Sequence, residues 1–235
     1  MAQPPEINET FLREVDENLR RDQLRDVAQK NATWIILAVI VFLGASGGLI
    51  WYQQHKVQLA QQHIEQLADI YKDVGNGKIG AAPQQLDDLS KSGAKAVRAS
   101  AQFTRADVAL QQDDAKLAAT KFGEIANDGS LPKPYRDAAL IRQTALQFDQ
   151  LKPEEVIARL EPLAKPGSPW FGTASEMTAL AMIKQGKKDE AGRLFIAIAK
   201  DKTVPDDLRQ RAVQIAASLG LDVSAASAAL GSQAQ

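Results

Sequence analysis

The stretch that decides the fold runs from residue 172 to residue 205 and reads GTASEMTALAMIKQGKKDEAGRLFIAIAKDKTVP. Apolar and small residues recur in it every three or four positions, the spacing of one face of a helix. Gly186 lies near its middle, so the stretch predicts two helices joined by a turn. A small residue at Ala179 would let the helices pack closely, and Phe195 would fill the space toward the next pair.

The same pattern occurs 73 residues earlier in the chain. Ala179, Gly186, Ala191, Phe195, Ile198 and Ala199 align with Ala106, Asp113, Ala118, Phe122, Ile125 and Ala126. A weaker unit lies between them, and a still weaker one precedes them. The equivalent large apolar position then recurs at Leu89, Phe122, Leu160 and Phe195, at spacings of 33, 38 and 35 residues. A period near 34 is the signature of a repeated helical pair.

These residues resemble the tetratricopeptide repeat, in which small residues, Gly, Ala and a large aromatic residue recur in this order. Ser175 stands where that family favours Trp, so the repeat is degenerate. From Pro83 onward no convincing strand pattern occurs, and Pro162 should kink or end the helix in which it lies. We therefore expect an all-α fold with a tetratricopeptide-like solenoid; an irregular Ala-rich helical bundle is the alternative. The expected repeat core is Ala106, Ala118, Phe122, Leu160, Ala179, Gly186, Ala191 and Phe195.

Ahead of the repeats lies the apolar stretch WIILAVIVFLGASGGLIWY, residues 34–52, with no Lys, Arg, Asp or Glu between Lys30 and Lys56. One helix of this length crosses the roughly 30 Å hydrocarbon core of a bilayer. Trp34, Trp51 and Tyr52 would place aromatic rings at the two membrane interfaces. Gly44 and Gly48 form a small-xxx-small pair on which another membrane helix could pack. A cleavable signal peptide is the competing interpretation, since small residues follow the apolar run.

The flanking charges predict how the chain is oriented. Five Lys and Arg residues precede the span, against Lys56 and Lys72 in the first twenty residues after it. This bias favours a cytoplasmic N-terminus. We expect a cytoplasmic amphipathic arm (1–33), a transmembrane helix (34–52), an exterior stalk helix with repeats (53–220) and a disordered tail (221–235). The stalk should continue the spanning helix as far as the glycines at 75 and 77.

Composition excludes several classes of function. With 28 basic and 29 acidic residues the chain is nearly neutral, so nucleic acid is an unexpected partner. It contains no cysteine, and the two histidines, His55 and His63, lie too far apart for a helical metal-ligand pair, so we expect them to be solvated. No phosphate-binding, dinucleotide or catalytic-triad motif occurs. We expect neither an enzyme nor a cofactor.

Residues along most of the chain resemble the bacterial inner-membrane family of ancillary Sec translocon subunits. They are Phe11 to Glu17, Arg20 to Arg25, the Trp34 span, Ser168 to Trp170, Ala174, Glu176, Gly186, Ala191, Phe195, Pro205, Leu208, Arg211 and Ala212. The resemblance implies a non-catalytic periplasmic scaffold or co-chaperone. Its implied partners are Sec translocon subunits and a membrane-anchored, prolyl-isomerase-like chaperone. A structural or cell-division protein of the envelope using the same repeats is the alternative. The repeats alone predict a concave surface for peptides or proteins.

Overall fold

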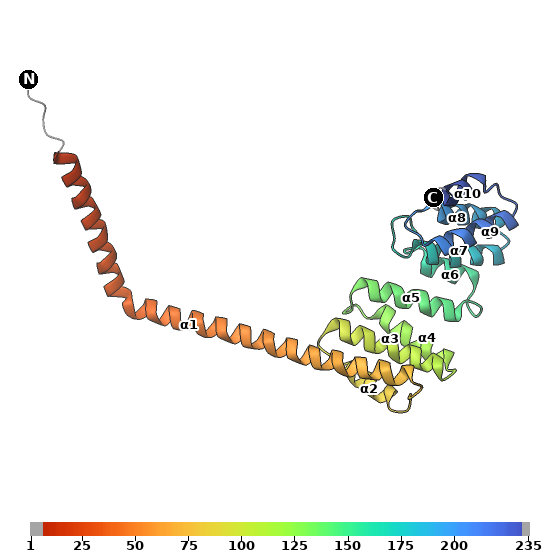
Figure 1. Cartoon of the computed structure of the whole chain (residues 1–235), viewed down its shortest axis with the longest axis horizontal. Helices are drawn as coiled ribbons and strands as arrows, with labels where there is room; N and C mark the ends of the chain where they lie inside the picture. The colour runs from red at the N-terminus through yellow and green to blue at the C-terminus, as the bar shows by residue number, and fades with distance from the viewer. Residues whose placement is uncertain (1–6, 232–235) are drawn as a thin grey trace, which may run out of the picture. The chain divides into compact units, whose positions relative to one another are not determined.

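The computed structural model describes the backbone of residues 7–231 and most side chains between residues 30 and 228. Those residues form helices and no strand, in the order shown in Figure 1. The helices are α1 (Ile7–Gly75), α2 (Ala82–Leu89), α3 (Lys95–Gln111), α4 (Ala115–Asn127), α5 (Lys133–Gln147), α6 (Pro153–Leu160), α7 (Phe171–Lys184), α8 (Lys188–Lys200), α9 (Asp206–Ser218) and α10 (Ser224–Gly231). The predicted all-α fold, one long apolar N-terminal helix followed by helical repeats, is confirmed.

The chain divides into two compact units, residues 1–59 and residues 60–235. Helix α1 supplies the described part of the first unit, and its last turns belong to the second. It ends at Gly75, where the sequence predicted the end of the stalk helix. The predicted amphipathic face of the 1–33 arm falls almost wholly on side chains outside the described residues.

The second unit is a series of helix pairs (Figure 1): the end of α1 with α2, then α3 with α4, α5 with α6, α7 with α8 and α9 with α10. Each large apolar residue predicted from the repeat lies on the second helix of a pair. Leu89, Phe122, Leu160 and Phe195 are all buried, with at most 4% of their surface exposed. Each belongs to a different hydrophobic cluster, and each cluster joins one helix pair to the first helix of the next pair.

Two of the loops between pairs repeat each other in sequence and in hydrogen bonding. Asp128-Gly-Ser-Leu-Pro132 follows α4, and Asp201-Lys-Thr-Val-Pro205 follows α8. In each loop the Asp carboxylate accepts from the N–H and the hydroxyl of the Ser or Thr two residues on. The apolar residue before the proline, Leu131 or Val204, is buried. These carboxylates therefore hold the turn that leads into the next repeat.

The structure confirms one further expectation from the sequence, at Pro162, and contradicts another, in the tail. Helix α6 ends at Leu160, just before Pro162, as predicted. The tail, expected to be disordered from residue 221, instead contains α10, so that expectation is wrong for residues 224–231. Asp222 accepts from the Ser224 N–H at the start of α10, and Ala226 is 1% exposed against α8 and α9. Alanine's high helix propensity outweighs the low complexity of this stretch.

Candidate functional site

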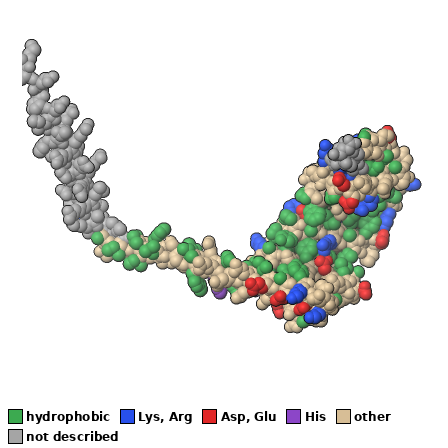
Figure 2. All heavy atoms as spheres, viewed as in Figure 1, with side chains coloured by type: hydrophobic (Ala, Val, Ile, Leu, Met, Phe, Trp, Pro, Cys, Tyr) green, Lys and Arg blue, Asp and Glu red, His purple; other side chains and the backbone are tan. Residues whose placement is uncertain are grey.

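A groove of about 410 Å³ opens on the first helices of three successive pairs. We call it the aromatic groove and define it by Tyr71 on α1, Phe103, Thr104 and Asp107 on α3, and Tyr135 and Arg142 on α5. Figure 2 shows hydrophobic side chains gathered on the visible face of the repeats, with single charged groups between them. The first helices line the groove, whereas the second helices carry the large apolar residues of the repeat core.

The three aromatic residues occupy matching places in successive repeats. Tyr71, Phe103 and Tyr135 are 32 residues apart, close to one repeat length. The Phe103 ring meets the buried Phe122 edge-on at 5.6 Å between centroids and lies 6.4 Å from the Tyr135 ring. Such edge contacts between aromatic rings are favourable, and they fix the position of Phe103. The groove therefore has a preformed aromatic wall attached to the core.

The groove has two charged groups, and they are paired with each other. Arg142 Nη1 lies 2.8 Å from Asp107 Oδ1. The Arg142 guanidinium also lies 5.5 Å from the ring centres of both Phe103 and Phe122. A cation over an aromatic face is attracted by the ring quadrupole, so Arg142 is held by the carboxylate and the rings together.

The Asp107–Arg142 pair is the first of three that join residues 35 positions apart. The others are Asp149–Lys184 at 2.7 Å and Glu176–Arg211 at 2.6 Å. Arg211 bonds both carboxylate oxygens of Glu176, and this hydrogen bonding raises the pKa of Arg211. Two of the pairs directly join first helices of successive repeats, and Asp149 follows the end of α5. Each contributes modestly, because the groups are partly exposed to water.

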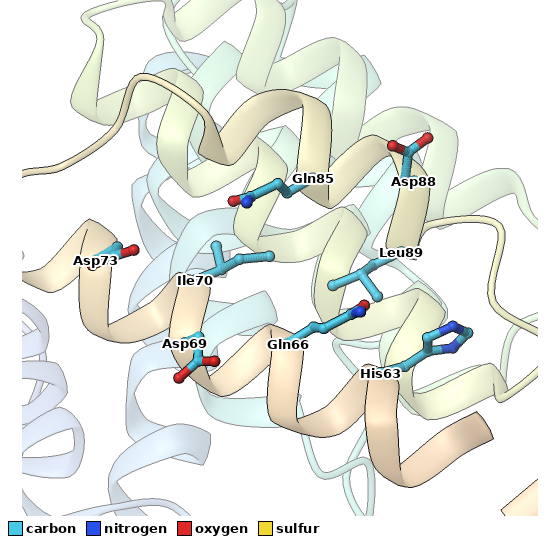
Figure 3. Close-up of a pocket in the computed structure, with 8 residues that line it drawn as sticks. All are labelled: His63, Gln66, Asp69, Ile70, Asp73, Gln85, Asp88 and Leu89. Atoms are coloured by element: carbon cyan, nitrogen blue, oxygen red, sulfur yellow. The ribbon is translucent and has the colours of Figure 1, made fainter. Parts of the chain in front are cut away.

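A second hollow, of about 440 Å³, lies between the end of α1 and α2 (Figure 3). His63 and Asp69 on α1 and Asp88 on α2 line it, together with glutamines. His63 is half-buried and its Nδ1 lies 2.8 Å from Ser92 Oγ, so the expectation that His63 is solvated is wrong. The imidazole ring packs against the loop that follows α2. This contact joins residues 29 positions apart, so the spacing of the two histidines could not predict it. Across the part of the chain that the structure describes, no three His, Asp or Glu residues are placed to hold a metal ion.

The sequence-predicted residues lie elsewhere. Ala106, Ala118, Ala179 and Ala191 are fully buried, and Gly186 follows α7 at φ 78°. In the first unit Trp34, Trp51 and Tyr52 are exposed, and a Cβ added at Gly44 or Gly48 would meet nothing within 4 Å. The groove residues were not predicted from the sequence. The 32-residue spacing of Tyr71, Phe103 and Tyr135 is the signal that could have found them.

Among the described residues one helical segment, Ala32–Gly75, is long and apolar enough to cross a membrane. None of its most apolar part is buried against the rest of the chain. A signal sequence near the N-terminus passes the same test of length and hydropathy, although its apolar region is usually shorter than a spanning helix.

Stacked helical pairs with an open groove on their first helices define a helical-repeat protein of the class that binds other proteins. A family model described as a tetratricopeptide repeat-like domain matches residues 26–216, and the chain belongs to that family. Neither the curated proteins nor the solved structures contain a match to this chain.

Proposed function

We propose that this protein is a non-catalytic, membrane-anchored scaffold whose aromatic groove binds a partner protein. The observation that carries the proposal is the groove itself, with Tyr71, Phe103 and Tyr135 at matching places on three first helices. Aromatic residues in a concave, partly desolvated setting are the ones that contribute most to protein binding. Repeat families use this concave surface for proteins and peptides, and their typical role is interaction rather than catalysis.

The anchor is the helix around residues 34–52, with the N-terminal arm in the bacterial cytoplasm and the repeats in the periplasm. The exposed aromatic residues Trp34, Trp51 and Tyr52 suit the two interfaces of a bilayer. The excess of Lys and Arg ahead of the span supports the orientation. Retention of this helix, rather than cleavage, gives the repeats a fixed attachment to the inner membrane.

The partners are Sec translocon subunits and a membrane-anchored periplasmic chaperone, which the protein links. The support is the resemblance of the sequence to ancillary translocon subunits, together with the repeat family. Gly44 and Gly48 pack against a partner's membrane helix, because two backbones approach closely where side chains are absent. A membrane contact and a groove contact then raise each other's effective concentration.

Photocrosslinking in bacterial membranes tests this proposal. A photoreactive residue replaces Tyr135 in the groove, and in a matched control it replaces Thr120, which is exposed on α4. Mass spectrometry of the products should recover translocon subunits or a periplasmic chaperone from position 135 and not from position 120. Recovery of cell-division or wall-assembly proteins at position 135 would favour the envelope role instead. Equal recovery at both positions would remove the groove from the proposal.

A further inference from the structure

The two charged groups lining the aromatic groove pair with each other. Asp107 and Arg142 pair at 2.8 Å, with side chains 44% and 51% exposed. The remaining defining residues are three aromatic rings and Thr104, whose hydroxyl donates to the Ser100 carbonyl oxygen of the preceding turn. A charged ligand would have to compete with this pair for a countercharge.

Apolar surface extends from the groove along α1. Ile64 and Tyr71, one heptad apart on the same helix, are 55% and 47% exposed. Residues seven apart on a helix share a face, and small Ala68 lies between them. Among the described large apolar side chains of the second unit, the three most exposed are Ile64, Tyr71 and Leu180, the last at 36%. Two of these three therefore lie on one strip that leads into the groove.

We infer that the aromatic groove takes an uncharged apolar segment of a polypeptide, one that presents aromatic or aliphatic side chains with no charged residue beside them. An acidic or basic side chain would have to compete with the Asp107–Arg142 pair or lose water without a partner. The loss of water is the larger cost, because the pair itself is half exposed. An apolar side chain loses nothing on leaving water and covers Tyr71 and Phe103. This inference rests on the proposed function, because it names the chemistry of the segment that the groove binds.

The test uses the full chain in nanodiscs of zwitterionic lipid and three fluorescent, end-blocked Gly/Ser peptides. At the same two positions the peptides carry Trp and Leu, two Asp, or two Lys. Fluorescence anisotropy should show the apolar peptide binding about tenfold more tightly than either charged peptide. Its affinity should change less than about twofold between roughly 50 and 500 mM salt, since no screened ion pair is formed. Empty nanodiscs give the background from lipid.

Three variants locate the effect. Tyr71→Ser should weaken the apolar peptide about fivefold or more, whereas the matched variant Leu180→Ser, on α7 outside the groove, should leave it unchanged. Asp107→Asn frees Arg142 and should tighten the Asp peptide about threefold. Circular dichroism establishes that each variant is folded.

Several outcomes overturn the inference. They are a charged peptide binding as tightly as the apolar one, no peptide binding above background, equal losses in Tyr71→Ser and Leu180→Ser, and no gain for the Asp peptide in Asp107→Asn. Each leaves the proposed function standing if the crosslinker at position 135 still captures a partner. Loss of that capture removes the proposed function itself.

Discussion

Asp113 and Gly186, 73 residues apart, end the first helices of their repeats with the same left-handed backbone, at φ 59° and φ 78°. The next residue in each case bonds five positions back: the Asp114 N–H donates to the Ala109 carbonyl and the Lys187 N–H to the Met182 carbonyl, both at 2.9 Å. This is the Schellman arrangement of a helix C-terminus. Glycine adopts it without strain, whereas aspartate does not.

Asp113→Gly should therefore stabilise the protein, and Gly186→Ala should destabilise it. Relief of the left-handed strain at Asp113, less the backbone entropy of glycine, amounts to roughly 0.5 to 1 kcal/mol. A Cβ at Gly186 meets nothing within 4 Å, so its cost of about 1 to 2 kcal/mol comes from the backbone alone. Urea unfolding of the full chain in detergent, followed by circular dichroism, measures both. Opposite signs are expected; a loss of stability in Asp113→Gly would mean that the two turns are not equivalent.

Phe122→Ala and Phe195→Ala should each lower the free energy of unfolding by about 3 to 5 kcal/mol, the usual range for emptying a large core site. Phe122 is 1% exposed and Phe195 is fully buried. The same urea experiment checks the result, with Leu180→Ala as a control, since Leu180 is 36% exposed and should cost much less. Unchanged midpoints in both phenylalanine variants would disprove their role in the repeat core.

The loops after α4 and α8 should make stability depend on pH in the acid range. The Ser130 hydroxyl bonds Asp128 and the Thr203 hydroxyl bonds Asp201, and these hydrogen bonds lower the pKa of each carboxyl. A lowered pKa in the folded state stabilises the fold above the ordinary Asp value of about 3.9, and the contribution is lost as pH falls below that value.

The double variant Asp128→Asn, Asp201→Asn keeps an acceptor oxygen in each loop but cannot titrate. Urea midpoints measured from about pH 5 down to about pH 2.5 should fall less steeply for the variant than for the natural protein. Parallel curves would show that these two carboxylates do not contribute to the acid sensitivity.

The membrane proposal predicts an N-terminus in the cytoplasm. A reporter active only in the periplasm, fused after Gln235, should be active, because the basic residues precede the span. N-terminal sequencing of the purified protein should find a start near Met1. An inactive reporter would reverse the orientation, and a start near Gly47 or Gly48 would establish cleavage.

The sequence predicted the repeats because their core depends on a few residues at fixed spacing. Close packing of the helices requires small residues at Ala179 and Ala191 and a large one at Phe195. The same order of small and large residues 73 positions earlier therefore indicated a repeat. The groove was not predicted, since an aromatic residue on a first helix, such as Phe103, fits a core position equally well until burial is known. The partly buried position of His63 and the helix α10 were not predicted for a related reason. His63 contacts Ser92, which is distant in sequence, and α10 is held by packing against α8 and α9.

Quantitative affinity capture from bacterial membranes tests whether a partner protein binds in the aromatic groove. The full chain, the double variant Tyr71→Ser, Tyr135→Ser and the control Leu180→Ser are purified in parallel, and translocon subunits and periplasmic chaperones are quantified in each. If the partner binds in the groove, their yield should fall about tenfold or more in the double variant and stay unchanged in the control, since aromatic anchors contribute most of the binding energy. Equal yields from the double variant and the natural protein, with both folded, would contradict it.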